Sequence, residues 1–574
     1  MNVATPVETL VTDHLDLWTT ALKRKSAAGR GSSSKVELYG IKKLRELILE
    51  LAVRGLLVPQ DPNDEPASEL LKKIDAEKAR LVKEGKIRKD KPLPPIAAGE
   101  APFAIPAGWA LARLADVINV LNGRAYKKHE MLSEGTPILR VGNLFTSNEW
   151  YFSDLELEPE KYIDDGDLIY AWSASFGPFI WQGGKVIYHY HIWKMEFFSK
   201  ADVDKFYFRH YLQVISASIK ASGNGIAMIH MTKVRMEKLV LPIPPLEEQR
   251  RIVAKVDELM ALCDQLEQET DASLGAHQTL VETLLSALTS AADHAQFASA
   301  WQRIAGHFDT LFTTEESIAQ LKQTILQLAV MGKLVPQDPN EEPASELLKK
   351  IEAEKAKLVK EGKAKKERLL PPVGDADAPY RLPQGWAWIR LGQCGVCSTG
   401  KTPSTNEPKY YDGDIPFIGP GQISIDGELS APEKFVSEAG LEESTEAKPN
   451  DIFMVCIGGS IGKAAIADKR LAFNQQINAI RPIQISSKYL YVAVSSKHFT
   501  DGVIAYATGS ATPIINRSKW EELPVPICSI QEQIRIVAKV DELMALCDQL
   551  KSRLADAQIT RLHLADALVE RAIC

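Results

Sequence analysis

The chain has 574 residues, of which 25% are charged and 45% hydrophobic, and its net charge of -7 excludes binding of nucleic acid by bulk charge alone. This length accommodates about four domains. Seven scattered cysteines do not form a disulfide pattern, and neither an export signal nor a membrane span is found, so we expect a cytoplasmic protein.

Two amphipathic helices are predicted first. Residues 41–57 place Ile41, Leu44 and Ile48 on one helical stripe. A proline-rich turn follows, and residues 70–86 form a second, highly charged helix. Residues 57–86 return at 334–363 with 27 of 30 positions identical, so the chain contains an internal repeat.

Each helical segment leads into an insert that we expect to be mainly β with some helix, because it is rich in Gly, aromatic and β-branched residues. The inserts open with Gly-Trp, at Trp109 and Trp386, and close with Leu-Pro-x-Pro, at Pro244 and Pro526. The inserts have diverged almost completely, although the sequences that flank them are nearly identical. This pattern suggests one scaffold that holds two different recognition modules.

A long helix follows each insert. Residues 247–266 return at 531–550 with 18 of 20 positions identical, and their apolar residues follow the 4-3-4-3 spacing of a coiled coil. If 246–290 is one helix, it is about 67 Å long at roughly 1.5 Å per residue. We expect the two long helices to pair antiparallel about a pseudo-twofold axis, with an ordinary core helix as the alternative. The expected seam residues are Ile252, Val256, Leu259, Cys263 and Leu266, and Ile536, Val540, Leu543, Cys547 and Leu550.

These patterns together predict an α+β protein, in which long antiparallel coiled-coil helices separate two mixed, mainly β domains and the whole forms an internal pseudo-twofold repeat. The expected regions are an N-terminal helical region at 1–100, the first insert at 101–245, a central helical region at 246–377, the second insert at 378–526 and a C-terminal helix at 527–574.

Charge is unevenly distributed inside each insert. Residues 130–170 contain ten acidic and two basic residues, whereas 171–245 contain nine basic and four acidic, and 456–520 contain eight basic and two acidic. A solvated face is one explanation. The basic halves are also rich in aromatic and amide side chains, and Arg, Lys, Asn and Gln read base edges and anchor phosphates. The candidate DNA-binding residues are Arg124, Lys127, Lys128, Arg140, Lys185, His189, His191, Arg209, Lys233, Arg235, Lys401, Lys463, Arg481, Arg517 and Lys519.

The order of these features resembles a known family. A Gly-Trp opening, a Pro-x-Pro close and a Glu-Gln dipeptide at Glu248 and Glu532, twice in one chain, resemble the specificity (S) subunit of Type I restriction-modification systems. The long helical arm before the first insert is similar to the Type IB branch. The segments 138–143, 400–404, 509–516 and 223–230 look like segments common in the target recognition domains of this family.

The resemblance implies that each insert is a target recognition domain, which reads one half of a split double-stranded DNA site. It also implies that the repeated helices form a spacer and dock two modification (M) subunits, which carry S-adenosylmethionine and methylate adenine. Two restriction (R) subunits with ATP and Mg would complete the nuclease. No cofactor and no catalytic residue is expected in this chain, because the Asn/Asp-Pro-Pro-aromatic loop of such methyltransferases is absent from its sequence.

Two motifs suggest other chemistry. Residues 395–402 match the phosphate-binding pattern G-x-x-x-x-G-K-T, but Pro403 follows at once and no helix is expected there. Cys394 and Cys397 form a lone C-x-x-C, which is too few ligands for structural zinc, so no metal site is expected. The alternative function is a coiled-coil assembly protein whose two inserts bind proteins or other ligands, and an ATPase is the third.

Overall fold

The computed structural model describes residues 6–24, 36–88, 93–173, 177–222, 231–364, 368–374, 377–509 and 512–573. Its contacts divide the chain into two compact units. Unit 1 comprises the described residues of 1–25, 36–271 and 558–574, and unit 2 those of 272–557. Each unit therefore contains one insert, the helices before it and parts of both long helices.

The helices that precede each insert occur in matching sets. In unit 1 they are α1 (Pro6–Asp13), α2 (Leu15–Thr20), α3 (Tyr39–Val53) and α4 (Ala67–Lys83). In unit 2 they are α10 (His294–Gly306), α11 (Phe308–Leu311), α12 (Glu315–Val330) and α13 (Ala344–Lys360).

The helix α3 ends four residues before the predicted end at Leu57, and the cause is local. Gly55 adopts a φ of 71°, and the amide of Leu56 donates to the carbonyl of Leu51, which is a left-handed glycine cap. Gly332 has a φ of 66° after α12. The glycine thus stops both helices at the same place.

The repeat extends further upstream than sequence identity shows. His14 and His307 have nearly the same backbone angles, with φ -123° and ψ 24° against φ -128° and ψ 21°. Both carbonyls accept hydrogen bonds from the amides three and four residues later. The first copy then inserts the hairpin of β1 (Lys23–Arg24) and β2 (Val36–Glu37) before α3, and this insertion hides the match.

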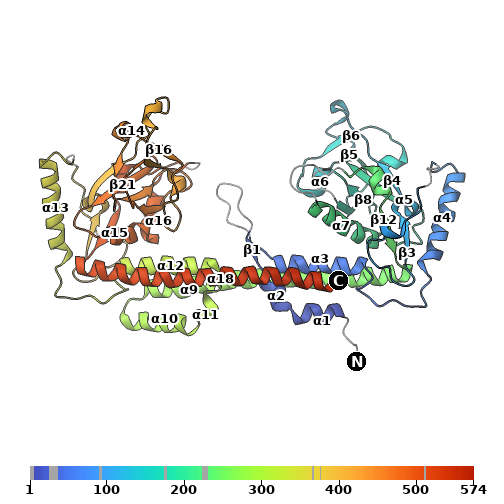
Figure 1. The fold of residues 1–574 in the computed structure, drawn as a ribbon, viewed down its shortest axis with the longest axis horizontal. Coiled ribbons are helices and arrows are strands. Elements are labelled where there is room, and N and C mark those ends of the chain that lie inside the picture. The colour runs from blue at the N-terminus through green and yellow to red at the C-terminus, as the bar shows by residue number, and fades with distance from the viewer. Residues whose placement is uncertain are drawn as a thin grey trace. The chain divides into compact units, whose positions relative to one another are not determined.

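The insert of unit 1, whose strands β3, β4, β5, β6, β8 and β12 are labelled in Figure 1, contains three sheets. Their strand orders are β6-β5-β10-β7, β4-β11-β8-β9 and β12-β3. Only β5 and β10 pair in parallel among these strands as described. The strands are β3 (Ala110–Arg113), β4 (Ile118–Asn122), β5 (Thr136–Leu139), β6 (Tyr151–Ser153), β7 (Tyr162–Ile163), β8 (Leu168–Ala171), β9 (Gly177–Ile180), β10 (Val186–Tyr188), β11 (Ile192–Phe197) and β12 (Val240–Ile243). The helices are α5 (Leu114–Val117), α6 (Val141–Phe145), α7 (Lys205–Ser222) and α8 (Lys233–Glu237).

The insert of unit 2 repeats this topology with the orders β16-β15-β20-β17, β14-β21-β18-β19 and β13-β22, and β15 and β20 form its parallel pair. The strands are β13 (Ala387–Arg390), β14 (Gly395–Thr399), β15 (Ile415–Ile418), β16 (Lys434–Val436), β17 (Glu446–Ala447), β18 (Ile452–Val455), β19 (Ala464–Ile466), β20 (Leu471–Phe473), β21 (Ile477–Pro482) and β22 (Pro524–Ile527). The helices are α14 (Glu438–Glu442), α15 (Ser487–Ser495), α16 (Lys497–Tyr506) and α17 (Arg517–Glu521). Two inserts whose sequences have diverged almost completely therefore share one fold, which is mixed and mainly β as expected.

The closing Pro-x-Pro motifs are not in equivalent positions. Pro242 pairs with Leu111, and Pro526 pairs with Trp388 at the same step of the matching two-stranded sheet. Pro242 and Pro526 therefore correspond, although the sequence motifs align Pro244 with Pro526.

The long helices are α9 (Leu246–Ser290), which has the bounds expected from the sequence, and α18 (Ile530–Ile573). Of the predicted seam, Leu543 and Leu550 are partly buried and the other eight residues are buried. In unit 2 the same hydrophobic cluster includes Ile318 and Ile325 of α12 and Val281 of α9. The seam of α18 therefore packs in one core with α12 and α9, and this core continues into the second insert through residues such as Trp520.

Polar contacts show how unit 1 arranges its three helices. Arg45 of α3 bonds to Asp264 of α9 at 2.6 Å, and Tyr39 of α3 donates to Asp566 of α18 at 2.7 Å. In unit 2, Gln320 of α12 donates to Glu282 of α9 at 3.1 Å. Helix α3 therefore contacts both long helices, α9 of its own repeat and α18 of the other repeat. Helix α12 likewise contacts α9, the long helix of the other repeat. None of the described helices is long and apolar enough to cross a membrane.

Candidate nucleic-acid interface

Three loops meet at one end of the strands in the first insert. The amide of His189 donates to the carbonyl of Leu139 at 2.9 Å, and the amide of Arg124 donates to that of Tyr188 at 3.0 Å. Gly123 allows this approach, because a Cβ there would lie 2.3 Å from the carbonyl oxygen of His189. The backbone frame of the three loops is therefore fixed by hydrogen bonds and close contact.

The second insert builds the same frame. The amide of Asn474 donates to the carbonyl of Ile418 at 3.0 Å, and that of Lys401 to Phe473 at 3.0 Å. A Cβ on Gly400 would lie 2.0 Å from the carbonyl oxygen of Asn474. These contacts make the following pairs equivalent: Gly123 and Gly400, Arg124 and Lys401, Arg140 and Gly419, His189 and Asn474, Tyr190 and Gln475, and His191 and Gln476.

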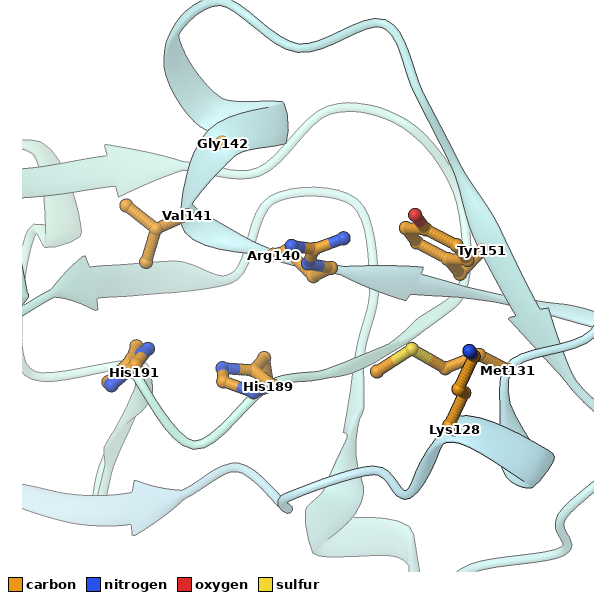
Figure 2. Close-up of a pocket in the computed structure, with 8 residues that line it drawn as sticks. All are labelled: Lys128, Met131, Arg140, Val141, Gly142, Tyr151, His189 and His191. Carbon is orange, nitrogen blue, oxygen red and sulfur yellow. The ribbon is translucent and has the colours of Figure 1, made fainter.

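In the first insert the loops surround a hollow of about 570 Å³. Figure 2 shows His189 and His191 side by side on one loop, with Arg140 on the loop opposite. The two imidazole centroids are 4.9 Å apart, and the Arg140 guanidinium lies 5.0 Å from the centre of the Tyr151 ring. The residues that line the hollow are Lys128, Met131, Arg140, Val141, Gly142, Tyr151, His189 and His191.

The basic side chains around this hollow differ in whether a carboxylate within the protein already pairs with them. Arg124 makes two hydrogen bonds to Glu130, at 3.0 and 2.7 Å, and these bonds lower the pKa of Glu130 to about 2. Burial, together with His191 and Arg140, lowers the pKa of His189 to about 4, so this imidazole is neutral at pH 7. Within the described part of the chain, no carboxylate forms an ion pair with Arg140. The hollow therefore presents an exposed guanidinium beside a neutral histidine.

A column of aromatic rings supports the histidine loop. Trp172 stacks on Trp193 with centroids 5.6 Å apart, Trp193 stacks on Tyr170 at 6.0 Å, and Trp172 meets His191 edge-on at 5.0 Å. The indole of Trp172 also donates to the carbonyl of Tyr190 at 2.8 Å. The column holds the loop from one side.

The second insert supports its loop with different chemistry. Asn478 and Cys456 take the places of Trp193 and Trp172, and the Asn478 amide donates to the Cys456 sulfur at 3.1 Å. On the loop itself, Gln475 accepts from the Thr402 hydroxyl at 2.6 Å. The Asn474 amide nitrogen lies 3.3 Å from the Gln476 side-chain oxygen, to which it donates. One frame thus carries aromatic and imidazole groups in the first insert and amides in the second.

The Gly-Trp and Glu-Gln signatures of the sequence meet in the structure. The indole of Trp109 donates to the buried carboxyl of Glu248 at 3.0 Å, and the Gln60 amide donates to the same carboxyl at 3.3 Å. Burial raises the pKa of Glu248, while these two donors lower it. In unit 2, Trp386 donates to Glu532 at 2.9 Å. These residues join each insert to the start of its long helix.

Comparison with known proteins decides the family. The sequence profile described as Type I restriction modification DNA specificity domain matches residues 106–275 and 383–560. The Type I restriction enzyme EcoEI specificity subunit of Escherichia coli is 39% identical over 99% of this chain and 100% of that relative. The chain belongs to the Type I specificity subunits.

Two further similar proteins are a specificity subunit and a solved structure. The EcoAI specificity subunit of Escherichia coli is also 39% identical, over 99% of this chain and 100% of its own length. The crystal structure of the HsdS subunit from Thermoanaerobacter tengcongensis matches with 17% identity and a TM-score of 0.36, and covers 83% of this chain and 98% of that one. Because the profile of the DNA specificity domain spans both inserts, they are called recognition domains below.

The structure gathers only part of the predicted set in the first recognition domain. Arg140, His189 and His191 line the hollow with Lys128, and Arg124 belongs to the same three loops. Lys127 is exposed beside Lys128, and Lys185 is exposed, with its ammonium group 4.4 Å from the centre of the Tyr162 ring. The remaining three lie outside the lining: Arg209 on α7, and Lys233 and Arg235 on α8.

Several predicted residues of the second domain have other partners. Lys401 belongs to the loop frame and pairs with Glu443 at 3.0 Å. Lys463 donates to the carbonyl of Ile423 at 3.3 Å, and Lys519 to that of Tyr506 at 3.4 Å. Arg517 pairs with Glu521 at 3.0 Å, and Arg481 makes two bonds to Asp451, at 2.8 and 2.6 Å.

The other quoted segments fall partly outside the described residues. Residues 223–230 lie outside them, as do 510–511 of the segment 509–516.

Tyr151 and Tyr190 are site residues that were not predicted from the sequence. Tyr190 stands between the two predicted histidines and is 40% exposed. Its place in the sequence between them could therefore have identified it as a site residue.

The phosphate-loop match does not have the geometry of a nucleotide site. Its first five residues form β14, and residues 401–404 are irregular with no helix beginning at Lys401. A phosphate loop needs a helix N-terminus at this place. Cys394 is fully buried, and burial raises its pKa to about 12, so the thiol is protonated at neutral pH.

Proposed function

We propose that this chain is a non-catalytic subunit whose two recognition domains each read one half of a bipartite double-stranded DNA site. The observation that carries this proposal is the shared loop frame with different side chains. The first domain presents His189, Tyr190 and His191, whereas the second presents Asn474, Gln475 and Gln476 at the same backbone positions. Such side chains read base edges and stack on bases, so two half-sites of different sequence are the expected targets.

The repeated helices are proposed to dock two M subunits and, through them, two R subunits. Lys72 and Lys73 on α4 are exposed, and so are their counterparts Lys349 and Lys350 on α13. Exposed positions that stay identical while the recognition domains diverge suit one partner that is bound twice. S-adenosylmethionine would then be held by the M subunits and ATP with Mg by the R subunits, in the cytoplasm.

A spacer series tests the bipartite function. The chain is co-purified with its M subunit. The methylated adenines in the genome of a host that carries both subunits are mapped to define the two half-sites. Binding is then measured on DNA whose gap is longer or shorter by one base pair, which displaces the half-sites by about 3.4 Å and rotates them by roughly 36°. We expect most of the selective affinity to be lost in both cases.

The outcome also separates the alternative function. Equal affinity for every spacer length would reject two rigidly coupled readers. If DNA binding in addition showed no salt dependence and no response to Lys185→Ala and Lys463→Ala, the recognition domains would bind proteins or other ligands instead. Release of phosphate from ATP by the isolated chain would support an ATPase.

A further inference from the structure

Arg140 is held in a fixed orientation at the start of α6. Its own amide donates to the side-chain oxygen of Asn143 at 3.1 Å, which fixes the backbone. Its guanidinium lies over the Tyr151 ring with 5.0 Å between the charge centre and the ring centroid. A guanidinium that rests on an aromatic ring keeps its plane and loses little entropy when its N–H groups bind a ligand.

The surroundings of Arg140 leave its charge available. Arg124, which lies in the neighbouring loop, is neutralised by two hydrogen bonds from its guanidinium to Glu130. Arg140 has no such carboxylate among the described residues, and its side chain faces the hollow together with His189 and Lys128 (Figure 2). The hollow therefore offers a planar pair of N–H donors next to an uncharged imidazole.

The base edge that fits this arrangement has two adjacent acceptors. In the major groove guanine presents O6 and N7, which match the two N–H groups of one guanidinium. Adenine presents N7 beside its amino group, so one guanidinium N–H would face another donor. We infer that Arg140 is a specificity-determining residue of the first recognition domain, which reads a guanine in its half-site.

The second recognition domain lacks this element. Its equivalent position is Gly419, whose amide is held in the same way by Gln422 at 3.0 Å. A Cβ on Gly419 would lie 3.1 Å from the side-chain nitrogen of Asn474, so this glycine leaves room for the amide loop. The guanine contact is accordingly assigned to the first domain alone, and the inference rests on the proposed function.

The test uses the full chain with its M subunit and a DNA pool in which both half-sites are randomised at the native spacer. Bound DNA is sequenced for the wild type, Arg140→Gln, Arg140→Lys and the control Lys185→Ala. We expect the wild type to select guanine at one position of the first half-site. Arg140→Gln should lower that selection by about tenfold or more and favour adenine, because an amide pairs with the N6 and N7 of adenine.

The other variants separate base reading from charge. Arg140→Lys keeps the charge but loses the two-pronged geometry, so it should also weaken guanine selection. Lys185→Ala, which removes an exposed charge outside the hollow, should weaken binding to all sequences alike. Unchanged selection in the second half-site shows that the variants are folded.

The inference is overturned if Arg140→Gln keeps the wild-type base preference at every position, or if it weakens all sequences equally, as a phosphate contact would. It is also overturned if the wild type selects no guanine in its first half-site. A wild type that selects neither half-site would reject the proposed function itself.

Discussion

Replacing Trp109 with Phe removes the indole donor that joins the first recognition domain to α9. The ring stays apolar, but the buried carboxyl of Glu248 keeps only the 3.3 Å bond from Gln60. A hydrogen bond to a charged group contributes about 1.5–3 kcal/mol. We expect a loss of roughly 2 kcal/mol in local stability around this contact, which corresponds to a ten- to hundredfold larger population of the locally open state.

The loss of local stability caused by Trp109→Phe should depend on pH. Burial raises the pKa of Glu248 in the folded chain, so this carboxyl stabilises the fold below its unfolded pKa, and that contribution is lost as pH rises through the folded pKa. The indole of Trp109 limits this loss, because it favours the charged form. The effect of Trp109→Phe should therefore be larger at pH 8 than at pH 5.

Hydrogen exchange measured by mass spectrometry is the suitable assay, because a chain of several units has no single unfolding free energy. Trp388→Phe is the matched control, since this indole donates to the neutral carbonyl of Tyr380 at 3.2 Å. The control should lose about 0.5–1.5 kcal/mol without a pH dependence. If Trp109→Phe costs the same stability at both pH values, or no more than the control, the indole of Trp109 does not stabilise a charged Glu248.

Two more variants test the interface. Gly400→Ala places a methyl group 2.0 Å from the carbonyl oxygen of Asn474, so it should abolish selection of the second half-site in a binding assay, whereas Gly421→Ala, with open space around it, should not. Arg481→Ala leaves the buried carboxyl of Asp451 with the Lys448 amide as its remaining donor, so we expect about 1–3 kcal/mol of local destabilisation by hydrogen exchange around Asp451, with an unchanged salt dependence of DNA binding. Unchanged hydrogen exchange around Asp451 with a weaker salt dependence of DNA binding would instead make Arg481 a phosphate contact.

The helical framework could be predicted from the sequence because it rests on local patterns. The apolar spacing of residues 252–266 predicts the first half of α9, and the helix continues through the polar stretch 267–279 to Ser290, because no proline stands between Leu246 and Ser290. The earlier end of α3 depends on Gly55, whose backbone conformation the periodicity does not encode. The match of His14 with His307 was hidden because the inserted hairpin breaks the alignment before α3.

The candidate site was harder to predict, since charge alone does not show where a side chain points. Arg124 and Arg481 have the residue type of a DNA contact, but both are bound to carboxyl groups. Arg124 bonds to Glu130, six residues away, and Arg481 bonds to Asp451, which is much further away along the chain. The use of Tyr151 as a platform for Arg140 depends on how β6 pairs with β5. Such contacts arise from tertiary structure and have no periodic signal.

The repeat itself indicates which layers of the site carry specificity. The glycine and the backbone hydrogen bonds are the same in both recognition domains, so they define the frame and not the target. The loop side chains differ, and the layer beneath them differs as well: Trp172 and Trp193 stack under the histidines, whereas Cys456 and Asn478 bond under the amides. Because the supporting layer changes together with the loop, the position of each reading group depends on its own support. If these loops read DNA as proposed, the unit of specificity is the loop together with the strand residues beneath it, and both would have to change for a new target.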